Sequence, residues 1–270
     1  MKRFINPDKS TWKSLTKRSS ASYDSLEPLA KSIFKKVEKE GDLAIRGYTL
    51  KYDKVQLKSN IVSSDEISTA AQRIPKKLKI AIQKAKNNIE VFHKAQITST
   101  VKVETQPGVS CWQKKLPIEK VGLYIPGGSA PLFSTVLMLA VPAKIAGCNK
   151  LILCSPPDNK GMLPDVILYT ANLCGVDYIF KVGGMQAIAG MTLGTESIPK
   201  ADKIFGPGNQ FVTVAKQLAT KYQVSIDMPA GPSELMVVAD KTGNPDFIAS
   251  DLLSQAEHGP DSQVILVTNN

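Results

Sequence analysis

The chain has 270 residues, of which 43% are hydrophobic and 21% are charged, and this balance is typical of a globular protein with a sizeable core. No run of about eighteen or more apolar residues occurs, so we expect no membrane-spanning helix and no membrane partner. The first eight residues lack the apolar run of a secretory signal. We therefore expect a cytoplasmic protein, built as one large α/β domain or as two smaller ones.

The formal net charge of +10 is distributed unevenly along the chain. Residues 1–120 hold 25 of the 34 Lys and Arg but only 12 of the 24 Asp and Glu. Such a basic half occurs in nucleic-acid-binding arms. Here the lysines fall on helical patterns without interleaved aromatic residues, which favours a solvated lysine face, and we expect no nucleic-acid partner. The charge would also steer an anionic substrate or cofactor toward the protein.

The four cysteines are Cys111, Cys148, Cys154 and Cys174, and no two of them form a C-x-x-C pair. Three of them stand in apolar surroundings. This pattern predicts buried, reduced thiols rather than a zinc or redox site.

The first half of the chain is predicted to be helical. Apolar residues recur at helical spacing from about residue 25 to residue 45, where Gly41 and Asp42 interrupt the run, and again from 64 to 92. Pro75 is expected to open the last of these helices. Alternating residues at 101–104 and 109–112, on either side of a Pro-Gly turn, predict a β-hairpin.

Beyond Pro117, short apolar strands alternate with helices. We predict strands over 121–125, 151–154, 178–182, 203–205, 224–227, 235–238 and 264–267, and helices over 136–146, 166–173, 187–193, 212–218 and 245–257. This alternation indicates a parallel sheet, and strands that are apolar throughout indicate that helices cover both of its faces.

The predicted fold class is therefore α/β, with two Rossmann-like parallel-sheet units and a helical N-terminal region. Residues 1–123 with 232–270 are expected to form one discontinuous domain, into which residues 124–231 insert as a second. The last predicted strand, 264–267, has no return element before Asn270. We interpret this as a sign that the natural polypeptide continues.

The standard dinucleotide fingerprint is absent, because no G-x-G-x-x-G follows a strand and no G-x-x-x-x-G-K-[ST] occurs. Four glycine-bearing loops follow predicted strands instead, at 126–128, 183–184, 206–209 and 229–232. Each loop alone is compatible with a tight strand-to-helix turn or with a ligand held close to the backbone. Because all four would lie at the carboxyl edge of one sheet, they favour a binding site there.

A second candidate site is the sequence Ser-Gln-Ala-Glu-His-Gly at 254–259. On a helix, Gln255 and His258 would share one face. The pair is compatible with a metal site or with an ordinary histidine at a helix end. Glutamine is a poor zinc ligand, and catalytic zinc usually has three protein ligands. The only other histidine, His93, is expected to have a structural role.

Four segments, 121–132, 203–209, 227–234 and 252–262, are similar to motifs of the histidinol dehydrogenase family and follow the family's order. The resemblance extends over most of residues 25–270. It implies a homodimeric oxidoreductase that depends on zinc and NAD and shares its active sites between subunits. Such an enzyme oxidises L-histidinol to L-histidine through an aldehyde, in the last step of histidine biosynthesis.

The resemblance also implies roles for individual residues. Tyr124, Gln186 and Asn209 would bind NAD, Ser233 would contact the substrate, and Gln255 and His258 would contact both zinc and the substrate. The family's other zinc ligands, an Asp and a His, and its Glu–His acid–base pair belong to a later segment that these 270 residues do not include. No catalytic residue is therefore assigned within this chain.

Glu257 is no substitute for the missing base, because it would point away from the ligand face of its helix. We predict that the chain alone binds zinc weakly and turns over little or no histidinol. The alternative is a non-catalytic remnant that retains only nucleotide binding.

Overall fold

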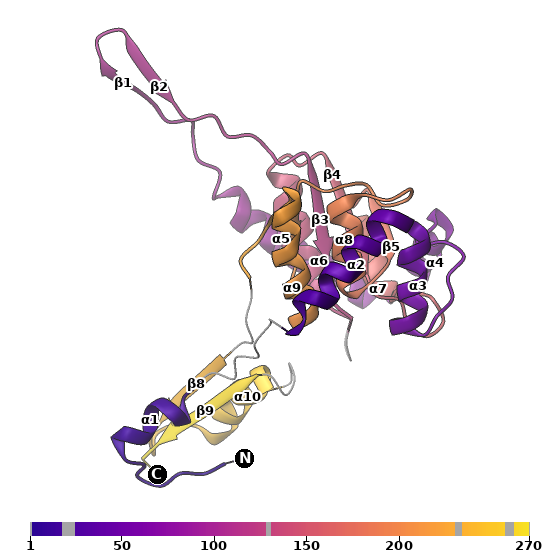
Figure 1. The fold of residues 1–270 in the computed structure, drawn as a ribbon. Coiled ribbons are helices and arrows are strands. Elements are labelled where there is room, and N and C mark those ends of the chain that lie inside the picture. The colour runs from indigo at the N-terminus through magenta and orange to yellow at the C-terminus, as the bar shows by residue number, and fades with distance from the viewer. Residues whose placement is uncertain (1, 18–24, 128–130, 230–233, 257–261, 270) are drawn as a thin grey trace. The chain divides into compact units, whose positions relative to one another are not determined.

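The computed structural model describes residues 2–17, 25–127, 131–229, 234–256 and 262–269 (Figure 1). The chain divides into two compact units, one formed by Tyr23–Pro229 and the other by Met1–Ser22 with Ala230–Asn270.

A five-stranded parallel sheet forms the centre of the larger unit. Its strands are β3 (Lys120–Tyr124), β4 (Lys150–Ser155), β5 (Tyr178–Lys181), β6 (Lys203–Phe205) and β7 (Ser225–Ile226). Their order across the sheet is β5-β4-β3-β6-β7, and every pairing is parallel. The chain thus builds outward from β3 in one direction and then returns to continue from β6 in the other. This is the doubly wound order, and its topological switch point lies between β3 and β6.

Helices cover both faces of this sheet. On one face α4 (Ser64–Arg73) packs on α7 (Asp165–Leu173), while α5 (Lys76–Lys94) packs on α6 (Phe133–Ile145). On the other face α2 (Glu27–Glu40), α3 (Asp42–Asp53), α8 (Gly184–Leu193) and α9 (Gln210–Ala219) lie together (Figure 1). The predicted helical N-terminal region is therefore present, and its helices pack against the sheet.

Local sequence explains where these helices form. In α2, the buried residues Ala30, Ile33, Phe34 and Val37 recur at helical spacing and form its core-facing stripe. At the start of α4, the Ser63 hydroxyl accepts from the Glu66 amide, and the Glu66 carboxylate accepts from the Ser63 amide. This capping box satisfies amides that the helix itself leaves unbonded.

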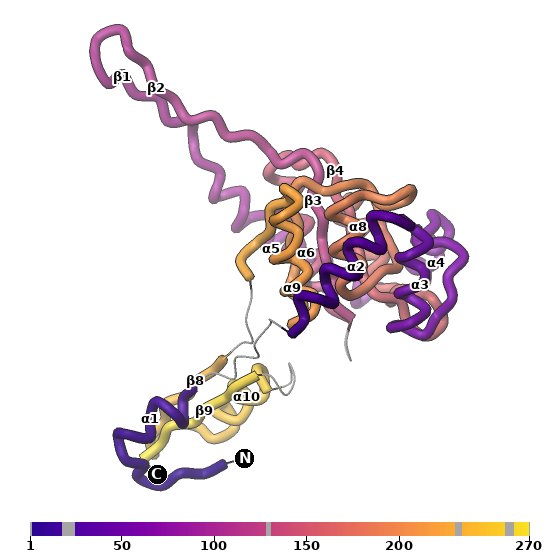
Figure 2. Tube along the Cα trace, viewed as in Figure 1, coloured from indigo at the N-terminus to yellow at the C-terminus, as the bar shows by residue number. Residues whose placement is uncertain are grey.

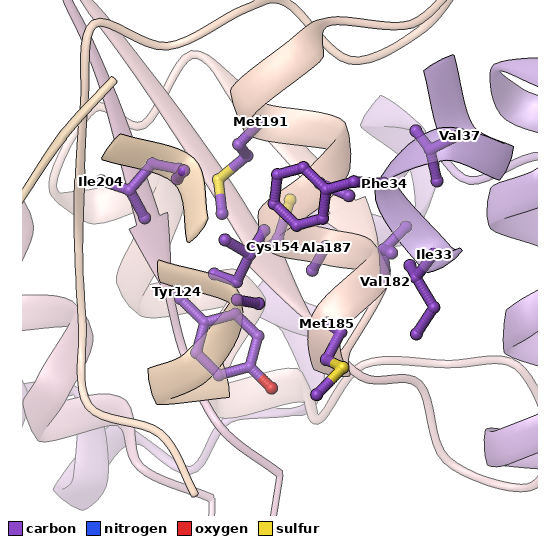
Figure 3. Close-up of a cluster of buried hydrophobic side chains, with 14 of the residues drawn as sticks. Ile33, Phe34, Val37, Tyr124, Cys154, Val182, Met185, Ala187, Met191 and Ile204 are labelled. Carbon is purple, nitrogen blue, oxygen red and sulfur yellow. The ribbon is translucent and has the colours of Figure 1, made fainter. Parts of the chain in front are cut away.

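The two cores of the unit follow from the two-residue period of the strands. Leu123 and Leu153 belong to the core beneath α5, α6 and α7, whereas Tyr124 and Cys154 belong to the core beneath α2, α8 and α9. Figure 3 shows Tyr124 and Cys154 in the second core with Phe34 of α2. Both sheet faces are apolar because both are covered, as the uninterrupted apolar strands predicted.

A β-hairpin, β1 (Lys102–Gln106) and β2 (Val109–Trp112), contributes no residue to these cores. Its Cα trace runs out and returns on itself (Figure 2). Every residue of both strands is exposed, including Val103 and Trp112. The predicted hairpin is therefore present, and Cys111 on it is exposed, whereas Cys148, Cys154 and Cys174 are buried free thiols.

The smaller unit contains α1 (Lys9–Leu15), β8 (Glu234–Ala239), α10 (Pro245–Ala256) and β9 (Gln263–Thr268). The strands β8 and β9 pair in parallel, and α10 contacts both of them. This is a second parallel βαβ arrangement, so the predicted α/β fold class is confirmed. Within the described residues, no helix is long and apolar enough to cross a bilayer.

The two compact units divide the chain at other positions than the domains expected from the sequence, because residues 25–123 share a unit with the five-stranded sheet. The assignment of 1–123 with 232–270 to one domain and 124–231 to another stays a prediction about the whole protein.

Candidate ligand site at the carboxyl edge of the sheet

Tyr124 is the last residue of β3 and lies directly at the switch point. Its side chain is 3% exposed, and its hydroxyl accepts a hydrogen bond of 3.0 Å from the amide of Gly184. Figure 3 shows the ring at one end of the core, with the hydroxyl oxygen on the side of Met185. Burial, the largest cause, raises the pKa of this hydroxyl to about 12. The hydroxyl therefore remains protonated at neutral pH.

The start of α8 forms the next part of this edge. Gly184 has a positive φ of 62°, and the helix has no side-chain cap at its N-terminus. Gln186, in the first turn, is 2% exposed. The Gly184 amide already donates to Tyr124, and the amides that follow it meet no side-chain cap from Gly183. Such amides, with the positive end of the helix dipole, suit an anionic group such as a phosphate.

The loop after β6 closes the other side of the switch point. Gly206 has a φ of 132°, and a Cβ atom on it would overlap the carbonyl oxygen of Tyr124. Only glycine fits this approach of two backbones without strain. Asn209 then caps α9, because its side-chain oxygen accepts from the Val212 amide at 3.2 Å.

An ion pair between α9 and the end of β7 fixes the loop that follows β6. Lys216 of α9 is 5% exposed, and its ammonium donates to the carbonyl of Gly206 at 2.7 Å and pairs with the Asp227 carboxylate. The other carboxylate oxygen of Asp227 accepts from the Gly206 amide at 2.8 Å. Sequence reasoning missed both residues, because their pairing joins a helix to a strand end and leaves no local pattern.

Two further glycines at this edge have no room for a side chain, because a proline packs against them. A Cβ on Gly127 would come within 2.7 Å of the Pro156 ring, and one on Gly183 would overlap the same proline. Close packing of strand ends thus accounts for these two positions. The sequence left open whether each loop was a tight turn or a ligand loop, and for these two loops the packing supplies a structural reason for glycine.

The structure brings together the three residues that the resemblance assigns to NAD. Tyr124 ends β3, Gln186 lies in the first turn of α8, and Asn209 caps α9. These positions belong to the same carboxyl edge, since β3, β5 and β6 are parallel.

Of the three residues predicted to bind zinc or substrate, Gln255 alone lies within the described residues, so their arrangement stays a prediction. Ser233 and His258 lie outside the described residues. Gln255 lies on α10 in the smaller unit, and its amide donates to the Ser262 hydroxyl at 3.4 Å. Elsewhere, His93 of α5 contacts Gln96 at 3.0 Å. The described residues contain no group of three or more His, Cys, Asp or Glu placed to hold a metal ion.

A separate open hollow lies beside the outer strand β5, lined by residues 56–59, 160–162, Glu66 and Lys181 among others. None of the residues predicted to have a functional role lines it. Within it, Lys181 and Glu66 already satisfy each other through an ion pair of 3.0 Å. We therefore place the candidate site at the switch point.

The strand order defines a doubly wound α/β protein, and its topological switch point is where such folds bind ligands. The family model described as histidinol dehydrogenase matches residues 16–270. The chain belongs to the histidinol dehydrogenase family.

Individual relatives agree with this assignment. The chain is 57% identical over all of its 270 residues to a histidinol dehydrogenase of Bacteroides thetaiotaomicron, and it covers 63% of that protein. It is 56% identical over 256 residues to the Salmonella typhimurium enzyme, of which it covers 58%. The crystal structure of histidinol dehydrogenase from Elizabethkingia anophelis superposes with a TM-score of 0.92 at 55% identity, over 99% of this chain and 62% of that one. The chain thus spans less than two thirds of the length of these relatives.

Proposed function

We propose that this chain supplies the dinucleotide-binding sheet of an L-histidinol dehydrogenase. The whole enzyme would oxidise L-histidinol to L-histidine through the aldehyde, with NAD as the oxidant, in the last step of histidine biosynthesis. The observation that carries the proposal is the position of Tyr124, Gln186 and Asn209 around one switch point of a parallel sheet. Dinucleotides bind at this position in doubly wound folds.

The residues at the edge fit such a cofactor. The uncapped start of α8 offers backbone amides and the positive end of a helix dipole to a phosphate. The Tyr124 hydroxyl is protonated at neutral pH and retains its own proton for donation. NAD, when bound, supplies the hydride acceptor. The task of Tyr124, Gln186 and Asn209 in this proposal is to orient it.

We propose Gln255 and His258 as zinc ligands that also touch the substrate, and Ser233 as a substrate-binding residue. Catalytic zinc usually takes three protein ligands, and the described residues hold no such cluster. Gln255 and His258 alone do not make a complete zinc site.

The same proposal includes the family's homodimer and a cytoplasmic location, without a nucleic-acid partner. The acid–base pair that the resemblance implies is not among these 270 residues. We therefore expect the 270-residue chain to bind NAD but to oxidise little or no histidinol by itself.

The test is a pair of measurements on the purified 270-residue protein. Titration with NAD⁺, followed by calorimetry, reports binding, and absorbance of NADH with L-histidinol and added Zn²⁺ reports turnover. Binding without turnover, in a protein with a folded far-UV spectrum, is the expected result. Absence of NAD⁺ binding by the folded protein would overturn the proposed role of the sheet. Rapid turnover would show that a base lies within residues 1–270 and would overturn the assignment of catalysis to other residues.

A further inference from the structure

A buried carboxylate oxygen without a partner lies next to the candidate site. Asp53 is the last residue of α3, and its Oδ2 atom is buried and makes no hydrogen bond within the part of the chain that the structure describes. Buried carboxylates without a partner are costly and uncommon, so this one requires an explanation.

The packing of α3 on α8 fixes where Asp53 lies. At the start of α3, the Asp42 carboxylate accepts from the Thr195 hydroxyl at 2.6 Å, just beyond the end of α8. One turn further, Ile45 lies against Gly190, in the last half of α8. The two helices are therefore antiparallel, and the far end of α3 reaches the start of α8.

The electrostatics agree with this placement. The charge of Asp53 acts on Tyr124, whose hydroxyl accepts from Gly184 at the first position of α8. Asp53 thus lies within electrostatic reach of the residue that ends β3, toward the carboxyl edge that carries the proposed cofactor residues.

In its ionised form, Asp53 does not stabilise the fold in this position. Burial raises the pKa of its carboxyl group from 3.8 to about 6, which means that the folded chain disfavours the charged form. It also lies at the C-terminal end of its own helix, where the helix dipole disfavours a negative charge. A side chain that costs stability at the edge of a binding site is expected to have a function there.

We propose that Asp53 is a ligand-binding residue that accepts hydrogen bonds from the ribose hydroxyls of the bound dinucleotide, an inference that rests on the proposed function. An ionised carboxylate is an acceptor only, so it selects hydroxyl or N–H donors and repels phosphate. A ribose offers two neighbouring hydroxyls, and a carboxylate is the acceptor that many doubly wound folds use for them. The phosphates of the same cofactor belong at the start of α8.

The test compares three proteins: the wild-type chain, Asp53→Asn and the control Asp65→Asn. Asp65 is an exposed acid in the first turn of α4, on the opposite face of the sheet. Titrations use NAD⁺, AMP and nicotinamide mononucleotide, the last two carrying one ribose each. Thermal unfolding of each unliganded protein checks that it is folded.

We expect Asp53→Asn to weaken NAD⁺ binding at least tenfold while raising the unfolding temperature of the free protein, and Asp65→Asn to leave NAD⁺ binding unchanged. A purely structural Asp53 would not produce these opposite effects. The mononucleotide whose binding also weakens identifies the ribose.

If the wild type binds NAD⁺ and Asp53→Asn binds it equally well, the role of Asp53 is overturned and the proposed function stands. If the folded wild type binds no NAD⁺, both are overturned. An Asp53→Ala variant repeats the comparison without the amide.

Discussion

Lys216 and Asp227 form an ion pair that also hydrogen-bonds both backbone groups of Gly206, its carbonyl and its amide. The ammonium of Lys216 donates to the Gly206 carbonyl at 2.7 Å, and the Asp227 carboxylate accepts from the Gly206 amide at 2.8 Å. The side chain of Lys216 is 6% exposed and that of Asp227 is 27% exposed. The pair thus fixes the backbone of the loop that carries Asn209, while its two charges satisfy each other.

Replacing Lys216 by Met is expected to destabilise the larger unit by about 3 kcal/mol, because it leaves the Asp227 carboxylate partly buried without its partner. Denaturant unfolding measures this change. The matched control is Lys221→Met, which removes an exposed pair with Glu27 at 3.2 Å and should cost less than about 1 kcal/mol. Equal effects of the two substitutions would show that the buried pair has no special role.

Gly206→Ala tests the contact between the two strand ends. The new Cβ would overlap the Tyr124 carbonyl oxygen, and a φ of 132° is unfavourable for alanine, so we expect a loss of at least about 3 kcal/mol together with weaker NAD⁺ binding. Gly47→Ala is the control, since Gly47 lies within α3 with no atom within 4 Å of the new Cβ. That change should stabilise the protein by about 1 kcal/mol. A mild effect at Gly206 would mean that the loop moves aside readily.

The sheet was predictable because its signals are local. Each strand is an apolar run of a few residues bounded by turn residues, and covered strands need no alternation to be recognised. The helix α1 was missed because none of its residues is buried, so no apolar period marks it. Its only local signal is Asp8, whose carboxylate caps the helix by accepting from the Ser10 amide.

The candidate site was predictable only in part. Family motifs pointed to Tyr124, Gln186 and Asn209, and the parallel sheet places them at one edge. Asp53 carries no such signal, since an aspartate at the end of an amphipathic helix is usually solvated. Its burial depends on the antiparallel packing of α3 on α8, a tertiary relationship that the helical period does not encode.

Tyr124→Phe tests the contribution of the Tyr124 hydroxyl separately from that of its ring. Phenylalanine keeps the buried ring but removes the acceptor of the Gly184 amide, which should cost about 1 to 2 kcal/mol and weaken NAD⁺ binding. Tyr178→Phe is the control, because Tyr178 is 37% exposed and lies at the start of β5, away from the carboxyl edge. It should change stability by less than about 0.5 kcal/mol. Unaltered NAD⁺ affinity in Tyr124→Phe would remove the hydroxyl from the binding site.

The raised pKa of Asp53 predicts how stability depends on pH. The folded chain holds this proton up to about pH 6, whereas the ordinary value is 3.8, so the unfolded chain ionises first as pH rises. The contribution of Asp53 to stability is therefore present below pH 3.8 and is lost between about pH 4 and pH 6. After allowance for partial solvent exposure, the loss should amount to about 1 to 2 kcal/mol.

Asp53→Asn has no proton to lose in this range. We therefore expect its free energy of unfolding to exceed that of the wild type by this amount at pH 7, with the difference shrinking toward pH 4. Urea unfolding of both proteins at intervals across this range measures the difference directly. Parallel pH profiles would mean that the Asp53 carboxyl is solvated and has an ordinary pKa. The unpaired oxygen would then already have water as its partner, and the stability cost that points to a ligand at this position would not exist.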